Sequence, residues 1–139
     1  MLEKILVATD GSDNSLRALE TAAAIARALR AELMVATAVY VPPSYESDLN
    51  PEQKQGIRDA GRQMLEEAGR VLARLGVKAN YRVLETEPPA QAIVRLAREG
   101  KYELIVLGRR GTSRGVEKTV GSVSDAVLRL ADCSVMIVH

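Results

Sequence analysis

The sequence predicts an α/β protein: one domain with a single open parallel sheet of five strands and four helices on both faces. Short apolar runs alternate along the 139 residues with longer segments in which apolar residues recur every three or four positions. Several of the runs are apolar throughout, which is typical of strands covered on both faces. Glycine, proline or aspartate follows most runs, so the chain turns where each strand ends.

The first strand is predicted over residues 4–9 and ends at Asp10-Gly-Ser12. The helix that follows, residues 13–30, has an alanine-rich face that indicates close packing on the sheet. Asp10 therefore lies at the carboxyl end of a strand, where open α/β sheets bind ligands. The spacing alone leaves open the alternative that Asp10 or Ser12 only caps the helix.

The second strand is predicted over residues 32–39, and a polar loop over 42–49 follows it. A long helix then starts at Asn50 with a proline in its first turn and a glutamine in capping-box position, and it stops at Gly76. Three glycines lie inside this helix, and each costs up to about 1 kcal/mol relative to alanine. We therefore expect its first half to be mobile.

The third strand, residues 77–84, alternates apolar and polar residues, which suits an exposed edge strand. A helix from Pro88-Pro89 to Gly100 leads to the fourth strand, residues 104–107. The last run, 134–139, is apolar through Val-Met-Ile-Val, so we expect a partner to cover it if it forms the other edge.

The segment after the fourth strand predicts a phosphate site. Gly108 and Gly111 would allow positive φ and a close approach to a ligand, and Ser122 would cap a helix with Asp125 in capping-box position. The free N–H groups at that helix start favour an anion. The loop between carries four cationic side chains, of which most are expected to face solvent: Arg109, Arg110, Arg114 and Lys118. The alternative is that these are ordinary turn residues.

Composition excludes several classes of function. Nineteen basic and eighteen acidic residues are mixed without blocks, which argues against a nucleic-acid or membrane surface. One cysteine and one histidine give neither an internal disulfide nor a zinc cluster. The N-terminus lacks the features of a signal peptide, so a cytoplasmic protein is expected.

The spacing Gly108-x-x-Gly111, nine residues, Gly121-Ser122 resembles the signature of the ATP-binding branch of the universal stress protein family. Residues 7–12 and 133–138 resemble that family too. The resemblance implies the strand order 3-2-1-4-5, which brings Asp10 and Gly108 together where the winding reverses. This chain departs from many members at Thr37, where they carry histidine, and at Ser134, where they often carry proline.

The resemblance also implies a site for ATP, with Mg²⁺ bound mainly through the phosphates. Its expected residues are Ala8, Thr9, Asp10, Ala38, Val39, Leu107, Gly108, Arg109, Arg110, Gly111, Gly121, Ser122, Val123 and Ser124. A homodimer through the last strand is implied as well, with an interface formed by Val135, Met136, Ile137 and Val138.

The functional expectation is a nucleotide-dependent switch that acts on an unknown protein partner. Slow hydrolysis at most is expected, because the sequence has no Walker lysine motif and no catalytic Asp/Asn loop. Receiver, PP-loop and dinucleotide-oxidoreductase signatures are absent or only vaguely echoed. The main alternative is a dimeric protein-interaction module of the same fold that binds no nucleotide.

Overall fold

Five parallel strands form one sheet in the order β3-β2-β1-β4-β5 in the computed structural model, which describes residues 2–109 and 121–139. The strands are β1 (Lys4–Ala8), β2 (Glu32–Ala38), β3 (Asn80–Leu84), β4 (Leu104–Gly108) and β5 (Ser134–Val138). Val7 lies beside Val35 on one side and Val106 on the other. The predicted sheet and strand order are confirmed, and β1 and β4 meet where the winding reverses.

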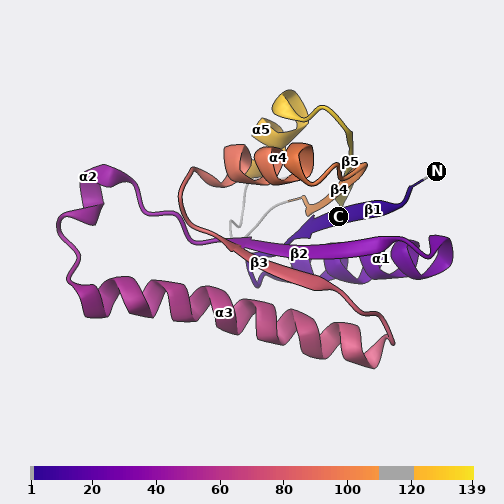
Figure 1. Cartoon of the computed structure of the whole chain (residues 1–139), viewed down its shortest axis with the longest axis horizontal. Helices are drawn as coiled ribbons and strands as arrows, with labels where there is room; N and C mark the ends of the chain where they lie inside the picture. The colour runs from indigo at the N-terminus through magenta and orange to yellow at the C-terminus, as the bar shows by residue number, and fades with distance from the viewer. Residues whose placement is uncertain (1, 110–120) are drawn as a thin grey trace.

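Helices cover both faces of the sheet (Figure 1). α1 and α3 lie on one face, and α4 and α5 lie on the other. Their bounds are α1 (Asp13–Leu29), α2 (Pro43–Glu46), α3 (Pro51–Arg74), α4 (Pro89–Glu99) and α5 (Ser122–Leu130). The short, fully exposed α2 lies in the segment predicted to be a loop and away from the sheet, so the four other helices form the two layers.

β3 is shorter than predicted. Gly76 takes φ +68, and the Val77 N–H bonds the Leu72 carbonyl of α3 at 3.0 Å, so the residues after the helix still belong to its C-terminal turn. Pairing with β2 begins only at Asn80, opposite Met34. β3 is an edge strand, as the alternating pattern predicts.

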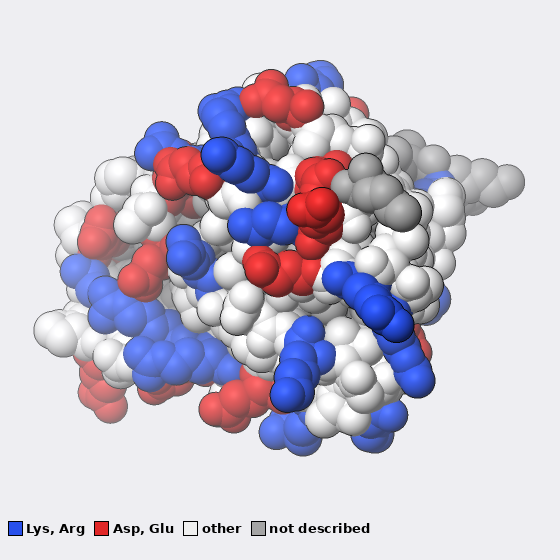
Figure 2. All heavy atoms as spheres, turned by 45° about the vertical axis from the view of Figure 1, so that its right-hand side comes forward, with Lys and Arg blue, Asp and Glu red and all other residues white. Residues whose placement is uncertain are grey.

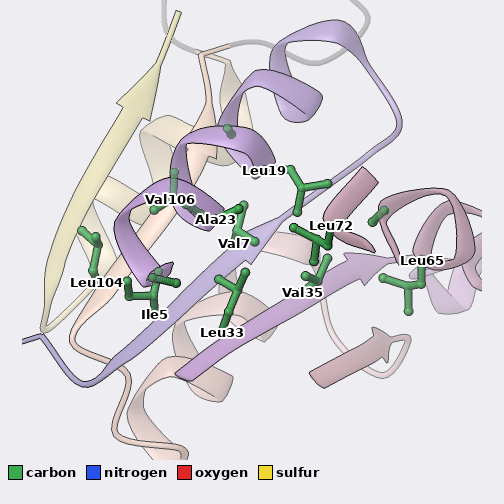
Figure 3. Close-up of a cluster of buried hydrophobic side chains, with 14 residues drawn as sticks. Ile5, Val7, Leu19, Ala23, Leu33, Val35, Leu65, Leu72, Leu104 and Val106 are labelled. Carbon is green, nitrogen blue, oxygen red and sulfur yellow. The ribbon is translucent and has the colours of Figure 1, made fainter. Parts of the chain in front are cut away.

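The core consists of one cluster on each side of the sheet. Figure 3 shows the cluster beneath α1 and α3, where Ile5, Val7 and Val35 from the strands meet Leu19 of α1 and Leu72 of α3, all with no exposed surface. The second cluster packs α4 and α5 on the opposite face. Burial on both faces is why the central strands carry apolar runs without alternation.

Charges of both signs are mixed over the face shown in Figure 2, and neither sign forms a broad patch there. Ion pairs such as Arg98–Asp132 and Arg129–Asp125 link exposed side chains that lie near each other. This face agrees with the balanced composition. Among the described residues, no helix is long and apolar enough to cross a bilayer.

Candidate functional site

The turn from β1 to α1 is held by its own side chains. Ser12 is the N-cap of α1, and its Oγ accepts a hydrogen bond from the Ser15 N–H at 3.2 Å. The Asp10 Oδ1 accepts the Ser12 N–H at 2.9 Å, and Gly11 has φ +82. The capping alternative is therefore realised by Ser12, while the exposed Asp10 uses one carboxylate oxygen to close the turn.

Buried hydroxyl groups tie this turn to the sheet. The Thr9 and Ser15 hydroxyls lie 3.0 Å apart, and the Thr37 hydroxyl donates to the Thr9 carbonyl at 2.7 Å. All three residues are at least nine-tenths buried. Thr9 thus has a side chain that faces inward, where it fixes the end of β1 against α1 and β2.

The end of β2 presents a backbone edge toward β1. The Val39 N–H donates to the Leu84 carbonyl of β3 at 2.8 Å. Because successive backbone groups of a strand point to opposite sides, the Ala38 N–H and C=O face β1. The last bond of that ladder runs from the Thr9 N–H to the Ala36 carbonyl, so within the described residues Ala38 lies past the end of its neighbour strand.

Gly108, the last residue of β4, is packed between two helices. A Cβ at this position would lie 2.7 Å from the Asn14 carbonyl carbon and 2.9 Å from the Ser15 nitrogen of α1. Its carbonyl accepts the hydroxyl of Ser124 in α5 at 2.9 Å. The prediction of positive φ at Gly108 is wrong, since in the described chain only Gly11 and Gly76 are glycines of that kind. The glycine is needed because α1 approaches so closely.

The start of α5 differs by one residue from the prediction. Gly121, not Ser122, is the N-cap, and no side chain of the described residues caps the helix. Asp125 does not form a capping box, because its carboxylate pairs with Arg129 one turn later at 2.9 Å. The first intrahelical bond runs from the Asp125 N–H to the Gly121 carbonyl. The N–H groups of the three residues between them are therefore left without a partner inside the helix.

Gly121 has φ −63 and ψ 159, an extended conformation that any residue can adopt. Its importance is therefore the missing side chain, so that no side chain at the N-cap itself covers the positive end of the helix. The Gly121 N–H donates to the Arg109 carbonyl at 2.8 Å, which joins the end of β4 to the start of α5.

The Arg109 side chain lies near the end of β5. Its Nη1 is 3.4 Å from the His139 Nδ1, and the backbone N–H of Arg109 donates to the Val138 carbonyl at 2.8 Å. Arg17 of α1 donates to the His139 carbonyl at 3.0 Å. The other residues predicted for this loop lie outside the described residues: Arg110, Gly111, Arg114 and Lys118.

Two residues of α3 that the sequence did not indicate lie beside the site. A Cβ on Gly61 would lie 2.8 Å from the Val39 Cγ1, and the Met64 sulfur is 3.5 Å from the Thr37 hydroxyl. A glycine in a helix interior is a signal of close packing, and this signal could have pointed to Gly61.

Few titrating groups are perturbed in the described chain, and none of these belongs to the edge formed by β1, β4 and α5. Burial raises the pKa of the Cys133 thiol, which lies just before β5, so it is not a ready nucleophile. Burial also raises the pKa of Tyr81 and of Tyr102. No three His, Cys, Asp or Glu side chains of the described chain are grouped as metal ligands.

Taken together, the site is an edge made of backbone groups: the Ala38 edge of β2, the Asp10 turn, and the open start of α5 beside Gly108. Such an edge suits an anionic ligand that also offers a planar polar group.

Comparisons with known proteins identify the family of the chain. All of residues 1–139 match the model of the universal stress protein family. The universal stress protein YxiE of Bacillus subtilis is 37% identical over the full length of both chains. A universal stress protein crystallised with cAMP is 34% identical with a TM-score of 0.78, covering 99% of this chain and 97% of that one.

The fold is also shared with the Archaeoglobus fulgidus universal stress protein solved in complex with dAMP. The two structures match with a TM-score of 0.77 at 24% identity, over 100% of each chain. The chain belongs to the universal stress protein family.

Proposed function

We propose that this protein binds ATP with Mg²⁺ across the carboxyl ends of β1, β2 and β4, and that it acts as a nucleotide-dependent regulatory switch. The observation that carries the proposal is the start of α5, where a glycine N-cap leaves the helix N–H groups open directly beside Gly108. A relative that is 34% identical has been crystallised with a cyclic adenine nucleotide, which supports a nucleotide of this class.

The phosphates would lie at the start of α5. The N–H groups of Ser122, Val123 and Ser124 are oriented along the helix axis, and the helix dipole adds positive potential there. The exposed Ser122 offers a hydroxyl, whereas the Ser124 hydroxyl already donates to Gly108. Mg²⁺ would neutralise the phosphates through their own oxygens and water, as is usual for this ion.

The base would lie at the Ala38 edge. The Ala38 N–H can donate to the adenine N1, and its carbonyl can accept from the exocyclic amine. Thr37 lies at the position where many family members carry histidine, and its hydroxyl donates a hydrogen bond to the Thr9 carbonyl. The Thr37 side chain is therefore buried against β1 and takes no place at the Ala38 backbone edge.

We expect little hydrolysis. Phosphoryl transfer needs a residue that positions water and charge that stabilises the transition state. In the part of the chain that the structure describes, the edge offers backbone groups, the Ser122 hydroxyl and the carboxylate of Asp10, one oxygen of which closes its own turn. A switch that responds to occupancy needs only binding that differs between two conformations.

The proposal includes a homodimer. β5 lies at an edge of the sheet with no partner strand on its outer side within the described residues, and Met136 there is 36% exposed. A two-fold copy that pairs β5 with itself would cover this edge. Without bound nucleotide, the same dimer would be the module of the alternative hypothesis, a protein-interaction domain.

The test is the nucleotide content of freshly purified protein, released by denaturation and identified by chromatography, together with MgATP titration of the melting temperature. Released ATP and a rise that grows with MgATP concentration are expected, since a ligand of the folded state stabilises it. Gly121→Asp places a carboxylate where the phosphate would lie, and it should remove both signals while the protein stays folded.

If the parent protein releases nothing and MgATP leaves its melting temperature unchanged, nucleotide binding is refuted. A dimer in sedimentation analysis would then support the interaction module instead.

A further inference from the structure

α3 lies on the same face of the sheet as α1 and extends past the carboxyl end of β2, where α2 and the connection to β2 are found (Figure 1). The last residues of β2 are therefore flanked by α3. The contacts of one turn of this helix, Gly61 to Met64, point to a role at the base end of the site.

Gly61 is buried, and its surroundings show that α3 packs closely on the end of β2 there. A Cβ on Gly61 would lie 2.8 Å from the Val39 Cγ1, 3.5 Å from the Val83 Cγ1 and 3.6 Å from the Thr37 Cγ2. Contacts under 3.0 Å are essentially never tolerated, so Val39 or the helix would have to move. Gly56, five residues earlier in α3, has nothing within 4 Å of such a Cβ.

Met64, three residues later, contacts Thr37, the residue before Ala38, and its side chain points toward the β1–α1 turn. Its sulfur is 3.5 Å from the Thr37 hydroxyl, and its side chain lies 3.9 Å from a Cβ built on Gly11 in the β1–α1 turn. The turn from Gly61 to Met64 thus packs against Thr37 and Val39, the two sequence neighbours of Ala38.

We propose that Gly61 and Met64 are positioning residues for the base: they hold the Ala38–Val39 backbone at the spacing that lets Ala38 discriminate adenine from guanine. This inference rests on the proposed nucleotide function. Ala38 offers an N–H donor next to a carbonyl acceptor. Adenine matches this pair with its N1 acceptor and its 6-amino donor, whereas guanine presents an N1–H donor and an O6 acceptor in the reverse order. A site built on such a pair rejects the mismatched base.

A purely structural role for α3 makes a different prediction. If the Gly61 contact only stabilised the fold, a substitution would change the affinity for ATP and GTP by the same factor, because both carry the same triphosphate. A positioning role changes their ratio, since only the base edge distinguishes them.

The experiment measures the dissociation constants of MgATP and MgGTP by calorimetry for the parent, Gly61→Ala and the matched control Gly56→Ala. We expect the parent to prefer ATP, and Gly61→Ala to weaken ATP about tenfold, the loss that follows from one hydrogen bond. GTP affinity should stay within about twofold, so the preference shrinks. Gly56→Ala adds the same methyl group to the same helix in open space and should leave both constants unchanged.

Two further variants keep the test independent of folding defects. Met64→Ala adds no atom and should also lower the ATP preference. Val39→Ala removes the Cγ1 that the new Cβ would meet, so the double variant Gly61→Ala/Val39→Ala should regain affinity for ATP relative to Gly61→Ala alone.

The outcomes are distinct. Equal losses for ATP and GTP, no loss for either, or a parent that binds both equally would overturn the positioning role while leaving nucleotide binding intact. A parent that binds neither nucleotide would overturn the proposed function, and the positioning role with it.

Discussion

α1 and α5 both begin at the carboxyl edge of the sheet, on opposite faces, and their first turns are built differently. α1 has a serine N-cap whose hydroxyl accepts an N–H, and Asp10 closes the turn before it. α5 has a glycine N-cap and no side-chain cap. In the described residues, the first turn of α1 thus has a side-chain cap, whereas that of α5 has none.

Gly108 lies between these two helix starts and contacts both. Its α-carbon faces the backbone of α1 at a distance that excludes a side chain, and its carbonyl accepts the Ser124 hydroxyl of α5. The comparison teaches that capping residues alone do not mark a ligand site. We propose a ligand site instead where a helix start lacks a cap and the surrounding packing holds it in place.

The largest effect should come from Gly108→Ala. The new Cβ would lie 2.7 Å from the Asn14 carbonyl carbon, and backbone cannot move aside as a side chain can. We expect a loss of about 3 kcal/mol in the free energy of unfolding, measured by urea denaturation. Gly56→Ala is the control and should stabilise slightly. A loss below about 1 kcal/mol would contradict the close packing of β4 on α1.

Ser124→Ala should come next. Ser124 is 6% exposed, and the substitution removes the hydroxyl that donates a hydrogen bond to the Gly108 carbonyl. Unfolding should become easier by about 1–2 kcal/mol. The exposed Ser122 provides the control, since Ser122→Ala should change stability by less than about 0.5 kcal/mol. Equal effects of the two substitutions would show that the Gly108 bond does not hold α5.

Ser12→Ala should lower stability by about 1 kcal/mol, because it removes the N-cap of α1. If the two helix starts divide their roles as we infer, this variant should bind MgATP within about twofold of the parent. Thermal unfolding without ligand and titration with MgATP provide the two measurements. A variant that keeps its stability but loses the nucleotide would reverse the assignment of the two helices.

Gly121→Ser should have the smallest effect on the unliganded protein. The extended backbone of Gly121 allows a serine cap, which is worth a few tenths of a kcal/mol over glycine, so the melting temperature should rise slightly. The same hydroxyl would accept a hydrogen bond from an N–H that the phosphate needs, so the additional rise in melting temperature on adding MgATP should shrink. An undiminished rise would place the phosphate elsewhere.

Much of the fold could be predicted from local patterns. The apolar runs of β1, β2 and β4 are buried on both faces, and the capping box that starts α3 forms between Asn50 and Gln53 as its residues predict. The elements whose bounds differ from the prediction lie where two local sequence signals compete. Residues 77–79 read as strand, yet Gly76 and the bond from Val77 to Leu72 keep them at the end of α3.

The candidate site was predicted less completely. Gly121 and Ser122 are both good N-cap residues. Which of them is the N-cap depends on a tertiary contact, the hydrogen bond from the Gly121 N–H to the Arg109 carbonyl. The reason for the glycine at Gly108 is also tertiary, since the neighbour that it accommodates is more than ninety positions away in α1. No local rule contains that contact.

The sequence by itself determined the class of fold and predicted the edge of the sheet at which we propose the site, because periodicity and turn chemistry act over a few neighbouring residues. Tertiary structure alone decided which helix start stays open, why Gly108 carries no side chain and why Gly61 lies inside a helix. Each of these depends on atoms brought together by packing, and the distances that settle them, such as 2.8 Å from Gly61 to Val39, are not written in any local pattern.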